Sequence, residues 1–108
     1  MNLQLDRIWF HDSEIHQVVE NPESDELGFE VMCPVDWDEN QFSPRTIVFK
    51  DALYYTVAEC PFAGRPTILN VTQEGEQEGR VLVRIETNAG LRTLLCLGLD
   101  IRDGWEAV

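Results

Sequence analysis

The strongest constraint on the fold of this chain is an alternation of apolar residues with mostly polar ones. In residues 26–33, the apolar set is Leu27, Phe29, Val31 and Cys33, and each member follows Glu26, Gly28, Glu30 or Met32. Side chains that alternate in this way lie on opposite faces of a β-strand, so one face is predicted to be buried and the other mostly exposed to water.

A second alternating pattern predicts a hairpin in the C-terminal half. The turn formers Asn88, Ala89 and Gly90 separate residues 81–85 from residues 95–101. One side of this hairpin is predicted to carry Val81, Val83, Ile85, Leu95, Leu97, Leu99 and Ile101, with partial burial of Leu82, Leu94 and Cys96 on the other side.

The remaining segments predict further short strands. Residues 13–20 fit a strand that forms a hairpin across the turn at 21–25, although Ile15, Val18 and Val19 also have helical spacing. Residues 45–50, 53–57 and 68–71 read as strands, with a short helix as an alternative at 53–57. Residues 34–44 are predicted to be an irregular loop bounded by prolines, and residues 74–79 an acidic, solvated turn.

This pattern predicts one mainly β domain over residues 1–108, an antiparallel sandwich or a strongly bent sheet of six to seven strands. On most strands, one of the two alternating sets of side chains is more consistently apolar than the other. The sheet is therefore predicted to have one face toward the core and a second, more exposed face. Such an exposed sheet face is a plausible binding surface.

The charge of the chain limits its partners. Twenty Asp and Glu residues against eight Lys and Arg residues give a formal charge of -12. A surface this negative repels nucleic acid and anionic membranes and attracts basic proteins, so a protein with a basic surface is the expected partner. The alternative is an acidic, solvated surface that implies no partner.

The cysteines and the N-terminal residues indicate the compartment. Three cysteines without CxxC spacing suggest neither a closed disulfide set nor a zinc site. Cys33 and Cys96 lie in apolar alternating runs and are predicted to be in the core, whereas Cys60, which precedes Pro61, is predicted to be exposed. The first ten residues contain no long apolar run, so we expect a cytoplasmic protein without a signal peptide.

Titratable residues are densest near the N-terminus. On a strand, Asp12, Glu14 and His16 would share one face and could hold a divalent metal ion. The alternative is that Asp12 forms a turn while Glu14 and His16 are solvated. Because the sequence has no HExxH spacing, no usable triad and no glycine-rich phosphate loop, we expect no cofactor and no catalytic activity.

Bulky aromatic residues offer a candidate recognition surface. Trp37 lies between Asp36 and the pair Asp38 and Glu39, so this loop would present an aromatic anchor within negative charge. Tyr54 is the further aromatic residue assigned to the predicted binding surface. The alternative is that Trp37 covers the end of the core.

The N-terminal run from Trp9 to Val19 resembles the opening of a group of small bacterial proteins. The matching residues are His11, Asp12, Ser13 and Ile15, and the likeness continues as a pattern of strands through residues 47–52, 68–71 and 95–101. Some members of this group are predicted immunity proteins of toxin systems. The resemblance implies a β-rich fold and, for some members, neutralisation of a toxin by binding; it implies no catalytic residues.

Three functions are therefore considered. The leading hypothesis is a non-enzymatic protein-binding module, of the immunity type, that neutralises a basic toxin. The second is a metal-dependent or small-ligand enzyme that uses Asp12, Glu14 and His16. The third is a structural subunit that forms a homodimer through its more apolar sheet face or an edge strand.

Overall fold

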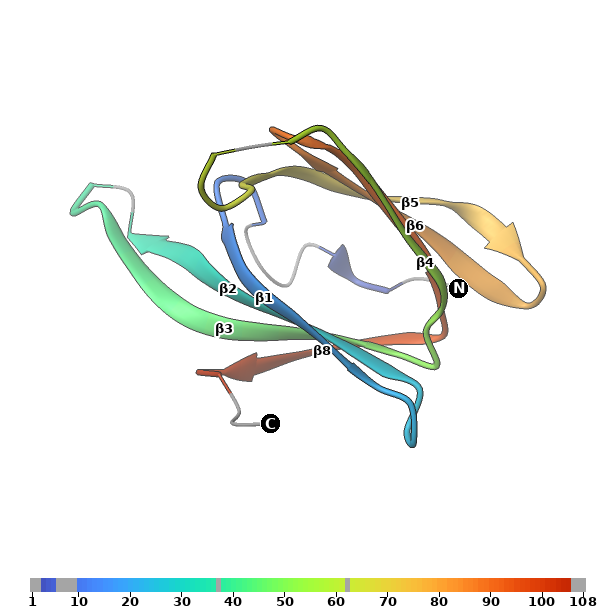
Figure 1. Ribbon diagram of the computed structural model, residues 1–108. Coiled ribbons are helices and arrows are strands. Elements are labelled where there is room, and N and C mark those ends of the chain that lie inside the picture. The colour runs from blue at the N-terminus through green and yellow to red at the C-terminus, as the bar shows by residue number, and fades with distance from the viewer. Residues whose placement is uncertain (1–2, 6–9, 37, 62, 106–108) are drawn as a thin grey trace.

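The described residues of this protein form eight antiparallel strands. The computed structural model describes residues 3–5, 10–36, 38–61 and 63–105. Its strands are β1 (Glu14–Asn21), β2 (Glu26–Asp36), β3 (Gln41–Lys50), β4 (Leu53–Glu59), β5 (Ile68–Gln77), β6 (Arg80–Thr87), β7 (Gly90–Cys96) and β8 (Gly98–Asp103). They form two four-stranded sheets, which confirms the predicted antiparallel, β-rich fold (Figure 1).

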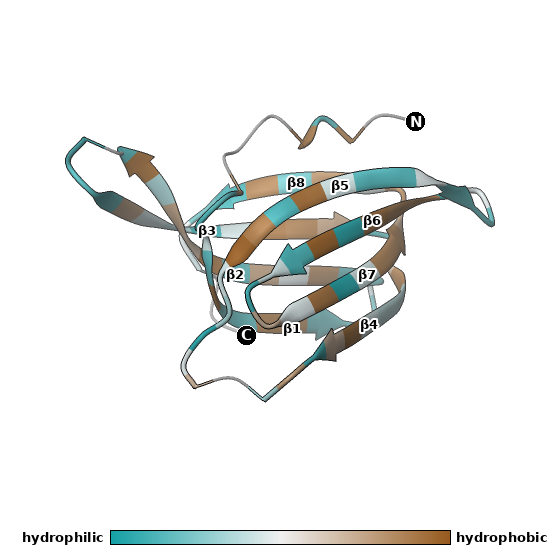
Figure 2. Cartoon of the chain, turned by 90° about the horizontal axis from the view of Figure 1, so that it is seen from above, coloured by the Kyte–Doolittle hydropathy of each residue, from teal (hydrophilic) through white to brown (hydrophobic). Residues whose placement is uncertain are grey.

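Two short connections of the chain lead from one sheet to the other and join the sheets along one side. The first sheet has the order β1-β2-β3-β8 and the second β4-β7-β6-β5. The chain crosses between β3 and β4 at Asp51 and Ala52, and between β7 and β8 at Leu97, whose N–H donates to the carbonyl of Lys50. Because these crossings lie side by side, the sheets share a bent corner and face each other across the core, as Figure 2 shows from above.

The crossing at Leu97 corrects two sequence predictions. The last predicted strand is two strands in different sheets, which brings the total to eight. The bend also changes which side chains face the core: Leu94 and Cys96 are buried in the core cluster, whereas Leu97 is exposed and Leu95 lies outside that cluster. Beyond the bend, Leu99 and Ile101 pack against the core as predicted.

The predicted loop at residues 34–44 is wrong over most of its length. β2 continues to Asp36 and β3 begins at Gln41. The two prolines are tolerated because Pro34 lies beyond the last residue of β2 that β1 pairs and Pro44 beyond the last residue of β3 that β8 pairs, so each has no paired strand on one side. Similarly, β5 runs on to Gln77 with a bulge between Gln73 and Glu76, so only residues 78–79 of the predicted acidic turn form a turn, while residues 74–79 are exposed as predicted.

Other predictions are confirmed. Residues 14–21 form a strand, not a helix, and pair with β2 across the turn at 22–25; residues 53–59 are also a strand. Cys33 and Cys96 are buried and Cys60 is exposed, and none of the three forms a disulfide with a described residue. Burial raises the pKa of Cys33, and raises that of Cys96 to about 11, so both are poor nucleophiles.

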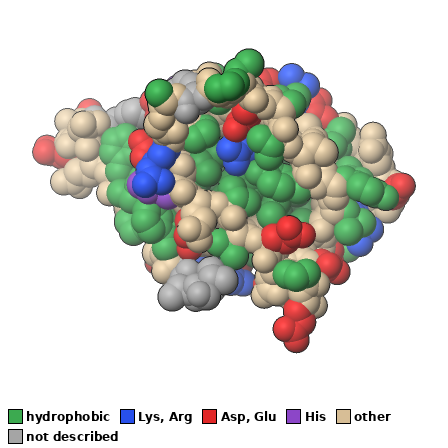
Figure 3. Space-filling view, viewed as in Figure 1, with side chains coloured by type: hydrophobic (Ala, Val, Ile, Leu, Met, Phe, Trp, Pro, Cys, Tyr) green, Lys and Arg blue, Asp and Glu red, His purple; other side chains and the backbone are tan. Residues whose placement is uncertain are grey.

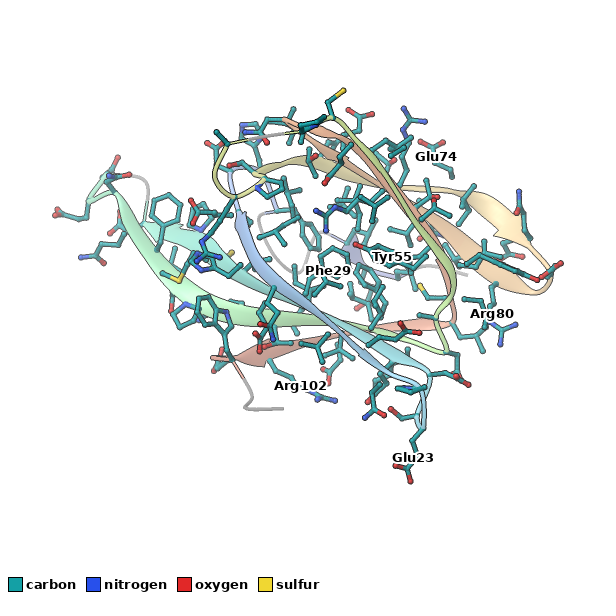
Figure 4. The ribbon with its side chains drawn as sticks, viewed as in Figure 1. Glu23, Phe29, Tyr55, Glu74, Arg80 and Arg102 are labelled. Carbon is teal, nitrogen blue, oxygen red and sulfur yellow. The ribbon has the colours of Figure 1, made fainter. Side chains whose placement is uncertain are left out.

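Phe29 links the two sheets at the centre of the core. Its ring meets Phe49 of β3 edge-on at 5.6 Å between centroids and Tyr55 of β4 at 5.7 Å. Figure 4 shows Phe29 and Tyr55 between the sheets. The buried cluster also includes Val31, Ile47, Val81, Val83 and Ile85.

The described part of the chain contains no helix long and apolar enough to cross a membrane.

Candidate functional site

A groove lies on the face of the first sheet that points away from the core. Two rows of side chains cross all four strands on this outer face. One row is Gln17, Glu30, Thr46 and Arg102, and the next is Val19, Gly28, Val48 and Asp100. Arg102 is seen below the first sheet in Figure 4, on the side opposite Phe29.

The groove exists because Gly28 contributes no side chain to the second row. A Cβ atom added at Gly28 would meet only ordinary contacts, 3.5 Å from Cγ2 of Thr46 and 3.8 Å from the carbonyl oxygen of Val19. Val19 and Val48 stand on either side of this gap and give it apolar walls. The resulting groove has a volume of about 400 Å³, which is within the range of small-ligand pockets.

The charged groups around the groove are mostly negative. Its lining contains the carboxylates of Glu20, Glu26 and Glu30 and one guanidinium, that of Arg102. Arg102 is already held by carboxylates, because its Nη2 lies 3.7 Å from Glu26 and its Nε donates to Asp100 at 3.1 Å. The hydrogen bond from Arg102 lowers the pKa of Asp100. The groove therefore keeps an excess of negative charge.

Glu30 is the unusual group in this groove. Glu30 is only 8% exposed as a whole residue, and its side chain has no hydrogen-bond or ion-pair partner among the residues that the structure describes. Its carboxylate oxygens are not among the fully buried, unpartnered atoms of the described residues, so the carboxylate still opens onto the groove. Glu30 thus offers unused acceptor capacity toward the groove.

A smaller hollow adjoins the groove. It has a volume of about 180 Å³, lies between the β1–β2 turn and the start of β4, and shares Glu20 and Glu26 with the groove. Tyr54 lines it with a side chain that is 66% exposed, on a backbone with φ of 53°. This conformation is rare for a bulky residue and is often found at functional sites.

The structure separates the residues of the predicted aromatic surface. Asp36 lies at the β2–β3 turn, where its Oδ1 accepts hydrogen bonds from the N–H groups of Asp38 and Glu39, and Trp37 lies outside the described residues. Tyr54 follows the other end of β3, a ten-residue strand about 30 Å long. Tyr54 therefore adjoins the groove, whereas the acidic turn does not.

The histidine-rich segment shows a different arrangement from a metal site. Among the described residues, no three His, Cys, Asp or Glu side chains gather closely enough to hold a metal ion, and this includes Asp12, Glu14 and His16. Nε2 of His16 lies 2.8 Å from Glu14, and the ring packs on Trp105 at 4.7 Å between centroids. Figure 3 shows a histidine beside basic and acidic side chains on the side of the molecule that faces the viewer.

Gly104 and Trp105 are hydrogen-bonded to strands of the first sheet. Thr46 donates its hydroxyl to the carbonyl of Gly104 at 2.7 Å, and the indole N–H of Trp105 donates to the carbonyl of Val31 at 3.0 Å. His16, whose ring packs on Trp105, immediately precedes Gln17, the first member of the row that contains Glu30.

A second polar cluster faces inward and is fully paired. Glu59 accepts two hydrogen bonds from Arg92, each at 2.8 Å, and a third from Thr87, while Arg92 also donates to the hydroxyl of Tyr55. The hydrogen bonds from Arg92 lower the pKa of Glu59. With its donors and acceptors satisfied, this cluster is suited to holding β4 against β7 rather than to binding a ligand.

The sequence contained one unrecognised signal for the groove. A glycine within a strand, as at Gly28, often marks a place where another molecule approaches the backbone. Glu30 instead had the appearance of a solvated residue, because its burial depends on neighbours from other strands.

Comparison of the chain with models of known protein families and with curated proteins finds no match.

Proposed function

We propose that this protein is a non-enzymatic binding module for a protein with a basic surface. The observation that carries the proposal is the groove on the outer face of the first sheet, which combines apolar walls with an excess of carboxylates. Protein–protein interfaces combine an apolar centre with charged groups around it. The apolar contact supplies affinity, and the complementary charges guide the encounter of the two proteins.

The distribution of charge supports the same proposal. Acidic side chains are scattered over the surface and its projecting ends, as Figure 3 shows for one face. With a formal charge of -12, the whole molecule attracts a basic partner over long distances. The groove and the adjoining hollow, with Tyr54 at their border, then form a local contact surface.

The resemblance of the N-terminal segment suggests which kind of partner this is. Some of the proteins that share the pattern around His11, Asp12, Ser13 and Ile15 are predicted immunity proteins. A basic toxin or nuclease is therefore the proposed partner, and the protein would neutralise it by covering its surface.

Loss of charge beside the groove is expected to weaken partner binding. A basic protein is first captured at low salt, identified by mass spectrometry and purified. Its association constant should fall about tenfold between 0.05 and 0.5 M salt, roughly the range over which surface charges become screened.

At low salt, the double variant E20Q/E26Q should bind the partner about tenfold more weakly, because both carboxylates border the groove and the hollow.

The matched control removes two charges elsewhere. The double variant E74Q/E78Q changes the net charge equally but lies at the far end of β5 and the following turn. It should weaken binding less than threefold. Binding that is independent of salt, or equal losses for the two double variants, would contradict a role for the groove.

A further inference from the structure

We infer that the groove on the outer face of the first sheet is a subsite for one arginine side chain of the partner, whose guanidinium pairs with Glu30. This assignment rests on the proposed function, since it names the group of the basic partner that enters the groove.

Glu30 is more than nine-tenths buried as a residue and its side chain has no partner among the described residues, yet its carboxylate opens onto a groove that is open to solvent. A cationic donor that enters the groove would satisfy this carboxylate, and hydrogen bonds between charged groups are the stronger ones.

The second step is the shape of the groove beside Glu30. Gly28 precedes Glu30 by two residues on the same face of β2 and leaves a gap between Val19 and Val48. An extended methylene chain can lie in this gap with apolar contacts on both sides, as the stems of long basic side chains do on protein surfaces.

The third step distinguishes arginine from lysine. A guanidinium presents five donors in a plane and is more weakly hydrated than an ammonium group, so it enters a partly apolar groove at lower cost. Thr46 lies directly across from Glu30 and donates its own proton to Gly104, which leaves its hydroxyl oxygen able to accept. Glu30 and Thr46 together therefore match a planar group with several N–H donors.

Arg102, the guanidinium in the lining of the groove, is already paired with carboxylates. Arg102 lies on the far side of Thr46 from Glu30 and contacts Glu26 and Asp100. Its charge is thereby largely balanced, so it leaves Glu30 available to an incoming guanidinium.

The test uses small probes and backbone amide NMR of the whole chain. Nα-acetyl-arginine amide is titrated into the protein, with the citrulline and lysine analogues as uncharged and ammonium comparisons. The arginine probe should shift the amide signals around Gly28, Glu30 and Val48 in a saturable way. The citrulline probe should bind at least tenfold more weakly and the lysine probe at least threefold more weakly.

Two variants test the site by different means. E30Q keeps the shape of the side chain but removes its charge, and G28V fills the gap in the groove from a position where a Cβ atom meets only ordinary contacts. Each should weaken arginine-probe binding at least tenfold. The control E23Q removes one charge from the exposed tip of the β1–β2 turn, labelled in Figure 4, and should change binding less than twofold.

The outcomes separate this inference from the proposed function. Equal binding of the arginine probe to E30Q, G28V and the unaltered protein would overturn the subsite, and equal binding of the lysine probe would overturn its assignment to arginine. If the basic partner still binds both variants with its salt dependence intact, the subsite is wrong while the binding module stands. If no basic partner binds but the probe binds through Glu30, the proposed function fails by itself.

Discussion

Replacing Glu59 with leucine is expected to lower the free energy of unfolding by about 3 kcal/mol, because the substitution leaves the Arg92 guanidinium buried without its counter-charge. The two side chains are only 11% and 10% exposed. Arg92→Met should cost about as much, since Glu59 then loses two of its three donors. Urea unfolding followed by circular dichroism measures both losses.

The double variant of this pair is the sharper part of the test. With both charges replaced by apolar groups of similar size, E59L/R92M should lose less stability than either single variant, because no unpaired charge stays buried. The exposed pair of Arg84 and Glu86 serves as control, and E86Q should change stability by less than about 0.5 kcal/mol. A double variant that loses the sum of the two single effects would contradict this account.

The same ion pair predicts a pH dependence. Arg92 holds the pKa of Glu59 below its ordinary value of 4.5 in the folded protein. Between the lowered pKa and the ordinary one, the unfolded chain binds more protons at this group than the folded chain does, so stability rises with pH there. The contribution is present above about pH 4.5 and is lost as the pH falls through the lowered pKa. Acid titration of stability should show this component in the unaltered protein and not in E59L/R92M.

Phe29→Ala is the second substitution with a large expected effect, a loss of about 4 kcal/mol. Phe29 is 1% exposed and touches aromatic rings from both sheets, Phe49 at 5.6 Å and Tyr55 at 5.7 Å between centroids. Its removal leaves a cavity between the sheets, where the rigid strands on both sides limit collapse. The same urea experiment gives the measurement.

A control on the same strand isolates the effect of burial. Val35 lies on β2 with a side chain that is 51% exposed, so Val35→Ala should change stability by less than about 0.5 kcal/mol. The intermediate substitution Phe29→Leu should fall between the two. Similar losses for Phe29→Ala and Val35→Ala would show that Phe29 does not connect the sheets energetically.

The β-rich fold was predictable because its signals are local. Alternation at Leu27, Phe29 and Val31 specifies a strand with one buried face wherever that strand is placed. The turns after Asn21 and at Asn88 and Ala89 are encoded by residues that themselves form turns. These features need no knowledge of distant parts of the chain.

The prolines and Leu97 show where local signals were misleading. Pro34 and Pro44 favoured a loop, yet both stand in strands because each lies where a neighbouring strand is missing on one side. The residues around Leu97 continue an apolar alternation, but the chain bends there into the other sheet and reverses which side chains face the core.

The candidate site depended almost wholly on tertiary structure. Sequence placed Trp37, its acidic neighbours and Tyr54 on one surface, although the acidic turn precedes β3 and Tyr54 follows the other end of that strand. The composition determined the negative charge of the molecule, and the alternation of residues determined its β-rich fold. The groove arises only when Gly28 and Glu30 meet Val48, Thr46 and Arg102, because the burial of a side chain on a sheet is decided by neighbours from strands far away in the chain.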